Sequence, residues 1–183
     1  TANLTNGQES VPVVPTLVNG SPRPISFGTA TFTLNDAQTA LTFTATIFNI
    51  DVTGSQTADV NDNLTAAHIH AGANSPPLNN SVVWGFFGAP FNDNAPSDSV
   101  VTPFANGVGG TFSGKWDLTE GNNTTLTAQL PNIFAGRAYI NFHTTQFGGG
   151  EIRGALLVPD GGTTAVLLIF GWVGLFARRR TKN

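Results

Sequence analysis

The three histidines of the chain fall in two short segments that alternate polar and apolar residues. His68 and His70 are separated by one residue, so in a β-strand both imidazoles project from the same face, about 6.5–7 Å apart along the strand. His143 ends the segment that begins at Tyr139, and Tyr139 and Asn141 share its polar face. Neutral imidazoles are good ligands for Zn and Cu. If the two segments lie side by side, the three imidazoles meet and form a metal site.

A glycine-rich turn follows His143, and Glu151-Ile-Arg153 then returns as the second arm of a hairpin. We expect Glu151 beside His143, as a fourth ligand or as a group that orients a ligand, and Arg153 beside Asn141. An alternative interpretation is a polar ladder without metal, in which these two pairs hold the hairpin together. Three histidines and an open position would also allow chemistry. Because no nucleophile and no acid–base pair accompanies the cluster, we expect no enzyme.

Calcium is the weaker cofactor prediction. The segment Asp59-Val-Asn-Asp-Asn63 has oxygen-bearing side chains at alternate positions, as calcium loops do, but it lacks the following glycine and the distal glutamate. We therefore favour an Asn/Asp-rich turn here. If the chain binds a metal, Cu or Zn at the histidines is the stronger candidate than Ca.

Period-two alternation dominates the elements that must position these groups. Residues 29–34 and 40–50 place Phe and Leu on one face and Thr on the other, which predicts an antiparallel hairpin. Further strands are expected over 65–71, 81–87, 110–118, 124–130, 137–144 and 151–158, with a long loop over 90–110. Short strands separated by turns favour an all-β sandwich or barrel. Residues 1–26 contain four prolines and predict an extended arm or edge strand, since proline cannot donate to a central ladder.

The charge balance argues against nucleic acid as a partner. Residues 1–160 hold four basic and eleven acidic residues, whereas nucleic-acid binding needs basic surface. Only 10% of all residues are charged, which favours self-association because little like-charge repulsion opposes contact. Without Cys no disulfide can form. Since the chain contains no Met, we expect Thr1 to be a processed amino terminus left by a removed signal peptide.

The last 26 residues follow the order of a membrane-targeting signal, with a turn, an uncharged apolar run and a basic stop. We expect a hydrophobic helix over residues 163–177, short for a membrane span, in which Gly171 and Gly174 allow close packing of helices. The flanking signal residues are Val158, Pro159, Asp160, Gly161 and Gly162 on one side and Arg178, Arg179 and Arg180 on the other.

This tail resembles the PEP-CTERM sorting signals in their Val-Pro-Asp-Gly-Gly variant. The resemblance implies a protein that is secreted or held at the cell surface of a Gram-negative-type bacterium. It also implies that the membrane and a sorting protease of the exosortase kind are partners during export.

Residues 1–157 resemble the chordin-type domain, CHRD, in four motifs. These are Leu4-Thr-Asn-Gly-Gln-Glu-Ser-Val-Pro12, Ala66-Ala-His-Ile-His-Ala-Gly72, Tyr139-Ile-Asn-Phe-His-Thr144 and Gly148-Gly-Gly-Glu-Ile-Arg-Gly154. The resemblance implies an extracellular, immunoglobulin-like antiparallel β-sandwich with Greek-key connections and no established catalytic activity. The chain would then consist of this domain over 1–157 and the sorting tail over 158–183.

From these features we expect a non-enzymatic structural protein of the bacterial surface or extracellular space. It would assemble into a homo-oligomer, filament or matrix through its amino-terminal arm and its carboxy-terminal helix. Two alternatives stay open. One is a histidine-ligated metal-binding protein or metalloenzyme on a superoxide-dismutase-like sandwich, and the other is a monomeric module tethered to a membrane.

Overall fold

The structure, a computed structural model, describes residues 1–157. The predicted helix over 163–177 and the sorting-signal residues lie outside the described residues. Within residues 1–157, no helix is long and apolar enough to cross a membrane.

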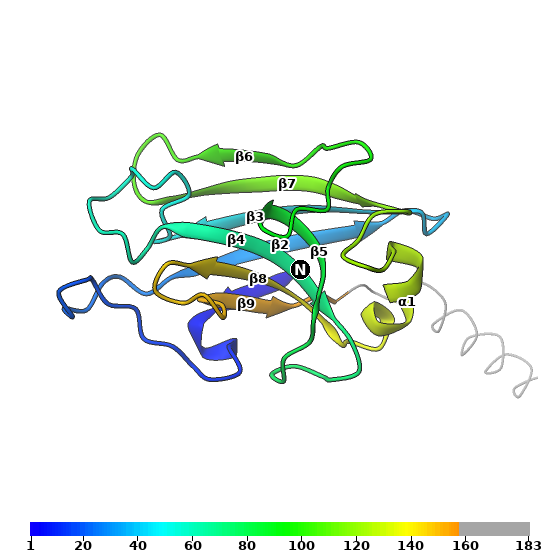
Figure 1. Ribbon diagram of the computed structural model, residues 1–183, viewed down its shortest axis with the longest axis horizontal. Helices are drawn as coiled ribbons and strands as arrows, with labels where there is room; N and C mark the ends of the chain where they lie inside the picture. Colours follow the sequence, from blue (N-terminus) through cyan, green and yellow to red (C-terminus); the bar gives the residue numbers. More distant parts are fainter. Residues whose placement is uncertain (158–183) are drawn as a thin grey trace, which may run out of the picture.

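Nine strands form one sheet in which every pair of neighbours is antiparallel (Figure 1). The sheet order is β5-β4-β8-β9-β1-β2-β3-β7-β6. The strands are β1 (Ala2–Thr5), β2 (Phe27–Leu34), β3 (Ala40–Phe48), β4 (Leu64–Ala71), β5 (Val82–Gly88), β6 (Val100–Pro103), β7 (Gly109–Asp117), β8 (Ala138–Thr144) and β9 (Ile152–Ala155). One α-helix, α1 (Leu126–Phe134), and one 3-10 turn, η1 (Asn6–Gln8), complete the described part. The predicted all-β class is confirmed.

The sheet curls so that its two halves face one another. β9 and β1 are joined by a single register pair, Thr5 with Arg153, which makes this junction the narrowest part of the sheet. Across the interior, the rings of Phe43 in β3 and Phe86 in β5 are 4.6 Å apart, although five strands separate β3 from β5 in the sheet order. The arrangement is a curled half-barrel with one hydrophobic core, and the expected immunoglobulin-like sandwich is not confirmed.

Aromatic rings fill the space between the two halves. The indoles of Trp84 in β5 and Trp116 in β7 stack with centroids 5.8 Å apart, and both side chains are fully buried. Phe86 contacts Phe43, Phe112 and Phe142, which come from three further strands. Because large apolar side chains carry most of the burial energy, this cluster stabilises the curled sheet.

The predicted hairpin of residues 29–34 and 40–50 forms as β2 and β3. Phe32 pairs with Phe43 and Thr31 with Thr44, so the apolar residues face the core and the threonines face solvent. The alternation of side chains in a strand requires this division once one face is buried.

The expected arm over residues 1–26 differs from the structure in two ways. β1 lies between β9 and β2 in the interior of the sheet, with Ala2 and Leu4 buried, so it is not an edge strand. The four prolines all follow β1 and leave its ladder intact. Residues 10–25 then fold back on the body, where Thr16 bonds Gln146 and Arg23 pairs with Glu151.

The expected strand over 124–130 is wrong, because these residues enter helix α1. The Thr125 hydroxyl caps the helix by accepting a hydrogen bond from the Ala128 N–H at 3.3 Å. Leu126, Leu130 and Ile133 follow helical spacing and are buried on one face. The expected loop over 90–110 contains the short edge strand β6.

Truncation of Phe86 tests whether one core holds both halves of the sheet. We expect Phe86→Ala to lower the free energy of unfolding by about 3–5 kcal/mol, because the ring contacts both halves and its removal leaves a cavity. Urea denaturation of the full chain, followed by tryptophan fluorescence, measures the loss. The matched control is Thr31→Ala on the exposed face, where we expect a loss below about 1 kcal/mol. Equal losses for the two variants would contradict a shared core.

Candidate metal centre

The antiparallel pairing of β4 with β8 positions the three histidines. In the register, His68 lies opposite Asn141, His70 opposite Tyr139, and Ala66 opposite His143. Residues two apart on a strand share a face, so the side chains of His68, His70 and His143 gather on one side of this strand pair. The structure therefore brings together the three imidazoles that the sequence analysis selected.

The imidazoles are close enough to share one ion. One ring nitrogen from each histidine lies within 4.8 Å of those from the other two, and all three side chains are buried. His68 Nδ1 and His143 Nε2 are only 3.3 Å apart. No other group of three or more potential metal-binding side chains occurs among residues 1–157.

Backbone carbonyls determine which nitrogen of each ring faces the cluster. A carbonyl can only accept, so a ring nitrogen in hydrogen-bond contact with one carries the proton, and the other nitrogen of a neutral imidazole keeps its lone pair. The contacts are His68 Nε2 with Ala89 O at 3.1 Å, His70 Nδ1 with Asn80 O at 3.0 Å, and His143 Nδ1 with Gly148 O at 3.1 Å. The lone pairs of His68 Nδ1, His70 Nε2 and His143 Nε2 therefore point into the same space.

Burial keeps these rings neutral. Desolvation, followed by the neighbouring imidazoles, lowers the pKa of His68 to about 4. Desolvation is also the main cause that lowers the pKa of His70 to about 4, and burial lowers the pKa of His143 as well. A proton shared between His68 and His143 would need an imidazolium, which these pKa values disfavour near neutral pH. His70 Nε2 is buried and has no hydrogen-bond partner among residues 1–157.

The cluster lies at a cavity of ≈ 580 Å³. Besides the histidines, its lining includes Thr65, Asn79, Asn80, Tyr139, Gly148 and Gly149, and none of the lining residues is acidic. The Tyr139 ring stacks on the His70 ring with centroids 4.8 Å apart and an interplanar angle of 5°. The guanidinium of Arg153, a residue of β9, lies 4.6 Å from the centroid of the Tyr139 ring. These contacts fix the orientation of the Tyr139 ring at the cavity wall.

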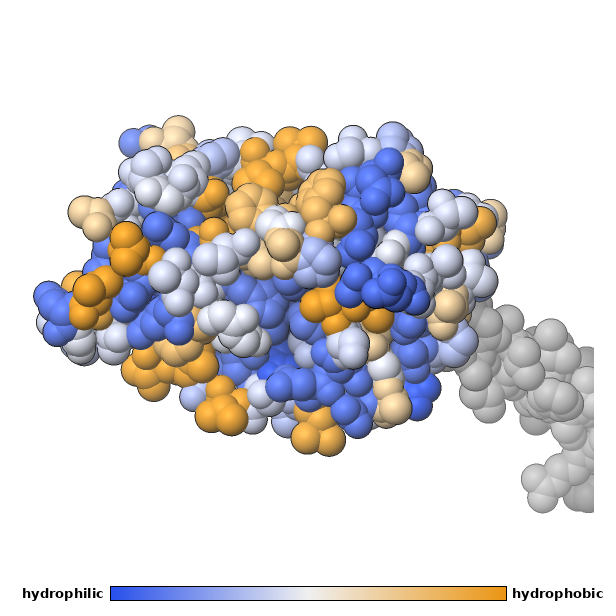
Figure 2. Space-filling view, viewed as in Figure 1, coloured by the Kyte–Doolittle hydropathy of each residue, from blue (hydrophilic) through white to orange (hydrophobic). Residues whose placement is uncertain are grey.

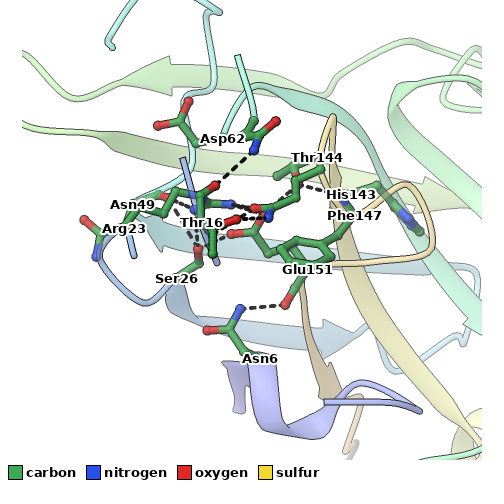
Figure 3. A network of polar contacts seen from close by, with 12 residues as sticks. Asn6, Thr16, Arg23, Ser26, Asn49, Asp62, His143, Thr144, Phe147 and Glu151 are labelled. Carbon is green, nitrogen blue, oxygen red and sulfur yellow. Dashed lines mark hydrogen bonds and ion pairs between the residues drawn. The ribbon is translucent and has the colours of Figure 1, made fainter. Parts of the chain in front are cut away.

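Glu151, expected as a ligand or as the group that orients one, has a different role. It precedes β9, and its carboxylate accepts hydrogen bonds from Thr144 Oγ1 and Arg23 Nη2, each at 2.6 Å, and from Ser26 Oγ. Figure 3 shows Glu151 at the centre of this network. Both side chains of the Arg23–Glu151 ion pair are almost fully buried, and the Glu151 carboxylate is not part of the histidine group.

The sequence analysis missed Arg23 and Glu9. Arg23 is the only basic residue before Lys115, and this isolation was the available signal. Asn141 and Arg153 do lie opposite one another, as expected, but the ion-pair partner of Arg153 is Glu9, at 2.9 Å from the Arg153 Nε. Burial raises the pKa of Glu9 to about 7, against the opposing effect of Arg153.

The acidic side chains of the segment considered for calcium accept hydrogen bonds from nearby loop residues. Asp59 accepts a hydrogen bond from the Val18 N–H at 2.9 Å, and Asp62 accepts from the Thr57 hydroxyl. The first contact ties the turn to the loop before β2, and the second lies within the turn's own loop.

The Glu9 carboxyl makes stability depend on pH in a defined direction. Its pKa of about 7 in the folded state exceeds the ordinary value of 4.5, so protonation of Glu9 favours the folded state. Its contribution to the free energy of unfolding is full below pH 4.5 and is lost as pH rises through about 7. The buried histidines act oppositely, because their contribution is full above pH 6.5 and is lost as pH falls through about 4.

Glu9→Gln isolates the first effect, because the amide does not titrate. We expect the stability of this variant relative to wild type to rise by about 3 kcal/mol between pH 4.5 and pH 8, from 1.36 kcal/mol per pKa unit. Denaturant unfolding of the full chain at several pH values measures it, with the exposed Asp36→Asn as the control. A difference that does not change with pH would contradict the raised pKa.

Comparisons with known protein families found matches for two segments of the chain, residues 1–156 and residues 158–182. Residues 158–182 match the VPDSG-CTERM motif, a close relative of the expected Val-Pro-Asp-Gly-Gly type, which points to export to the cell surface or extracellular space and to contact with a sorting machinery. No curated protein and no solved structure matches the chain. Residues 1–156, most of the sequence, match the CHRD domain. The chain therefore belongs to the CHRD domain family.

Proposed function

We propose that this exported protein binds one divalent transition-metal ion, Zn or Cu, through His68 Nδ1, His70 Nε2 and His143 Nε2. The observation that carries the proposal is the convergence of three lone pairs whose rings are each fixed by a carbonyl on the far side. Two acceptor nitrogens 3.3 Å apart repel one another unless a cation lies between them. A metal ion satisfies both, together with the unpartnered His70 Nε2.

The donor set selects the class of metal. Three neutral imidazoles without a carboxylate suit Zn and Cu, whereas Ca and Mg prefer oxygen ligands. The carbonyl acceptors behind the rings supply the orienting contacts that histidine ligands need. Because no carboxylate from the described part of the chain, residues 1–157, lines the cavity to act as an acid or base, we infer a binding role and not a catalytic one.

Metal titration tests the proposal. We expect ZnCl₂ and CuCl₂ to bind the full chain with one ion per protein in isothermal titration calorimetry. Burial lowers the pKa of all three histidines, to about 4 for His68 and His70, so protons compete less than at ordinary histidines, and the affinity should fall less between pH 7.5 and pH 5.5. A site of ordinary histidines, with pKa values near 6.5, would weaken steeply over this range.

The variant His70→Ala removes one ligand. Because loss of a group that merely orients a ligand weakens metal affinity roughly 10–100-fold, loss of the ligand itself should weaken it by about 100-fold or more. Val82→Ala, at the same cavity, is the matched control and should bind as wild type does. Circular dichroism verifies that both variants fold. Absence of binding by wild type, or equal affinity of His70→Ala, would refute the proposal.

The expected self-assembly has a separate observation in its favour. Four aliphatic side chains stand out from the loop before β2, with exposed fractions of 74% for Val11, 77% for Val14, 64% for Val18 and 68% for Ile25. Apolar side chains are visible at the lower left of Figure 2, where Figure 1 places this loop. Within residues 10–25 of this loop the one charged residue, Arg23, is buried in an ion pair, so the surface of this segment carries no charge. We infer that this loop mediates contact between copies of the chain.

Removing two of these side chains tests the contact. We expect wild type to associate as its concentration rises and Val11→Ser/Val14→Ser to do so more weakly, because exposed apolar area supplies the attraction. Sedimentation velocity of the full chain measures the association state, and Thr29→Ser/Thr31→Ser on the exposed face of β2 is the control. If wild type is monomeric at every concentration, the self-assembly proposal is refuted and the alternative of a monomeric tethered module remains.

A further inference from the structure

We propose that the fourth coordination position of the metal, facing the cavity beside Tyr139, binds a small monovalent anion such as a carboxylate. This inference rests on the proposed metal site. It names the class of ligand that would complete that site.

The charge balance of the site calls for an anion. Three neutral imidazoles leave the full charge of a divalent ion without compensation, and the Arg153 guanidinium lies close by, over Tyr139. The two nearby buried carboxylates are already paired, Glu9 with Arg153 and Glu151 with Arg23. Since none of the cavity-lining residues is acidic, residues 1–157 supply no counter-charge there. Uncompensated charge in a partly buried site is unfavourable, and an anion from solution relieves it.

The cavity has room for such a ligand. Its ≈ 580 Å³ far exceeds the roughly 30 Å³ that one water molecule occupies in the liquid, so a carboxylate of several heavy atoms fits. Gly148 and Gly149 line one wall, and no atom lies within 4 Å of the position that a side chain would take at either residue. This side of the cavity is therefore uncrowded.

Tyr139 offers a hydrogen-bond donor to the bound anion. Its hydroxyl oxygen accepts from the Asn80 N–H at 3.2 Å, and its own hydrogen has no acceptor among residues 1–157. Stacking on His70, the proposed metal ligand, holds the ring beside the metal position. A hydrogen bond to an anion is stronger than one between neutral groups, so this contact favours charged ligands.

Spectroscopy of the Cu-loaded full chain tests the inference. We expect sodium azide to produce a new ligand-to-metal absorption band that saturates with one azide per Cu, and sodium acetate to reverse it by competition. If Cu binds but neither anion changes the absorption or the paramagnetic resonance spectrum, the anion site is refuted and the metal site stands. If Cu does not bind at all, the metal proposal fails first.

Tyr139→Phe tests the donor. We expect the Cu-loaded variant to bind acetate about tenfold more weakly than Cu-loaded wild type, because the hydrogen bond to the anion is removed. The Asn80 N–H also loses its acceptor, so the Cu affinity of the variant is measured beside its acetate affinity. Val82→Ala is the matched cavity control and should retain wild-type acetate affinity. Unchanged acetate affinity in Tyr139→Phe would overturn the role of Tyr139. The wild-type azide and acetate titrations test the anion site whether or not the variant folds.

Discussion

The pairing of β4 with β8 is the constraint on which the proposed site depends. These two strands carry all three histidines, and their register decides that the imidazoles share a face. A slip by one residue would turn His68 and His70 toward the core and Ala67 and Ile69 outward, and the burial of Ala67 and Ile69 opposes such a slip. The apolar side of the strand pair therefore fixes the geometry of its polar side. The same hydrogen bonds that build the sheet align the donors of the proposed metal site.

A second constraint is the polar layer that covers this half of the sheet. The pairs Arg23–Glu151 and Glu9–Arg153 are buried, although burying a charge is unfavourable unless it is paired and hydrogen-bonded. Each pair joins the amino-terminal segment to the β9 end of the sheet. The loop before β2 is therefore tied to the body close to the turn that supplies Gly148 to His143. The turn that supplies Gly148 to His143 is followed directly by Glu151, so the Arg23–Glu151 pair lies next to the site in the chain.

Local pattern and tertiary contact contributed differently to what could be predicted. The hairpin of β2 and β3 and the shared face of His68 and His70 could be predicted from the sequence, since side chains alternate along a strand with a fixed period. Glu151 was assigned to the histidines because hairpin spacing places it near His143. Its actual partner, Arg23, is 128 residues away and could not be found from spacing. The sequence predicts a strand over residues 124–130, whereas burial of Leu126, Leu130 and Ile133 and the Thr125 cap decide for a helix.

The sequence by itself determined the all-β class, the candidate histidines and the export signal, because alternation, residue type and a linear targeting motif are local properties of the chain. Only the tertiary structure decided that the strands form one curled sheet, that β1 lies inside it, and that Glu151 forms an ion pair with Arg23. It alone also decided the tautomer of each histidine, since the carbonyls of Ala89 and Asn80 and of Gly148 reach the rings from separate loops. The physical reason is that a ring nitrogen becomes a donor or an acceptor through its neighbour in space, and for two of the three histidines that neighbour lies ten or more residues away along the chain.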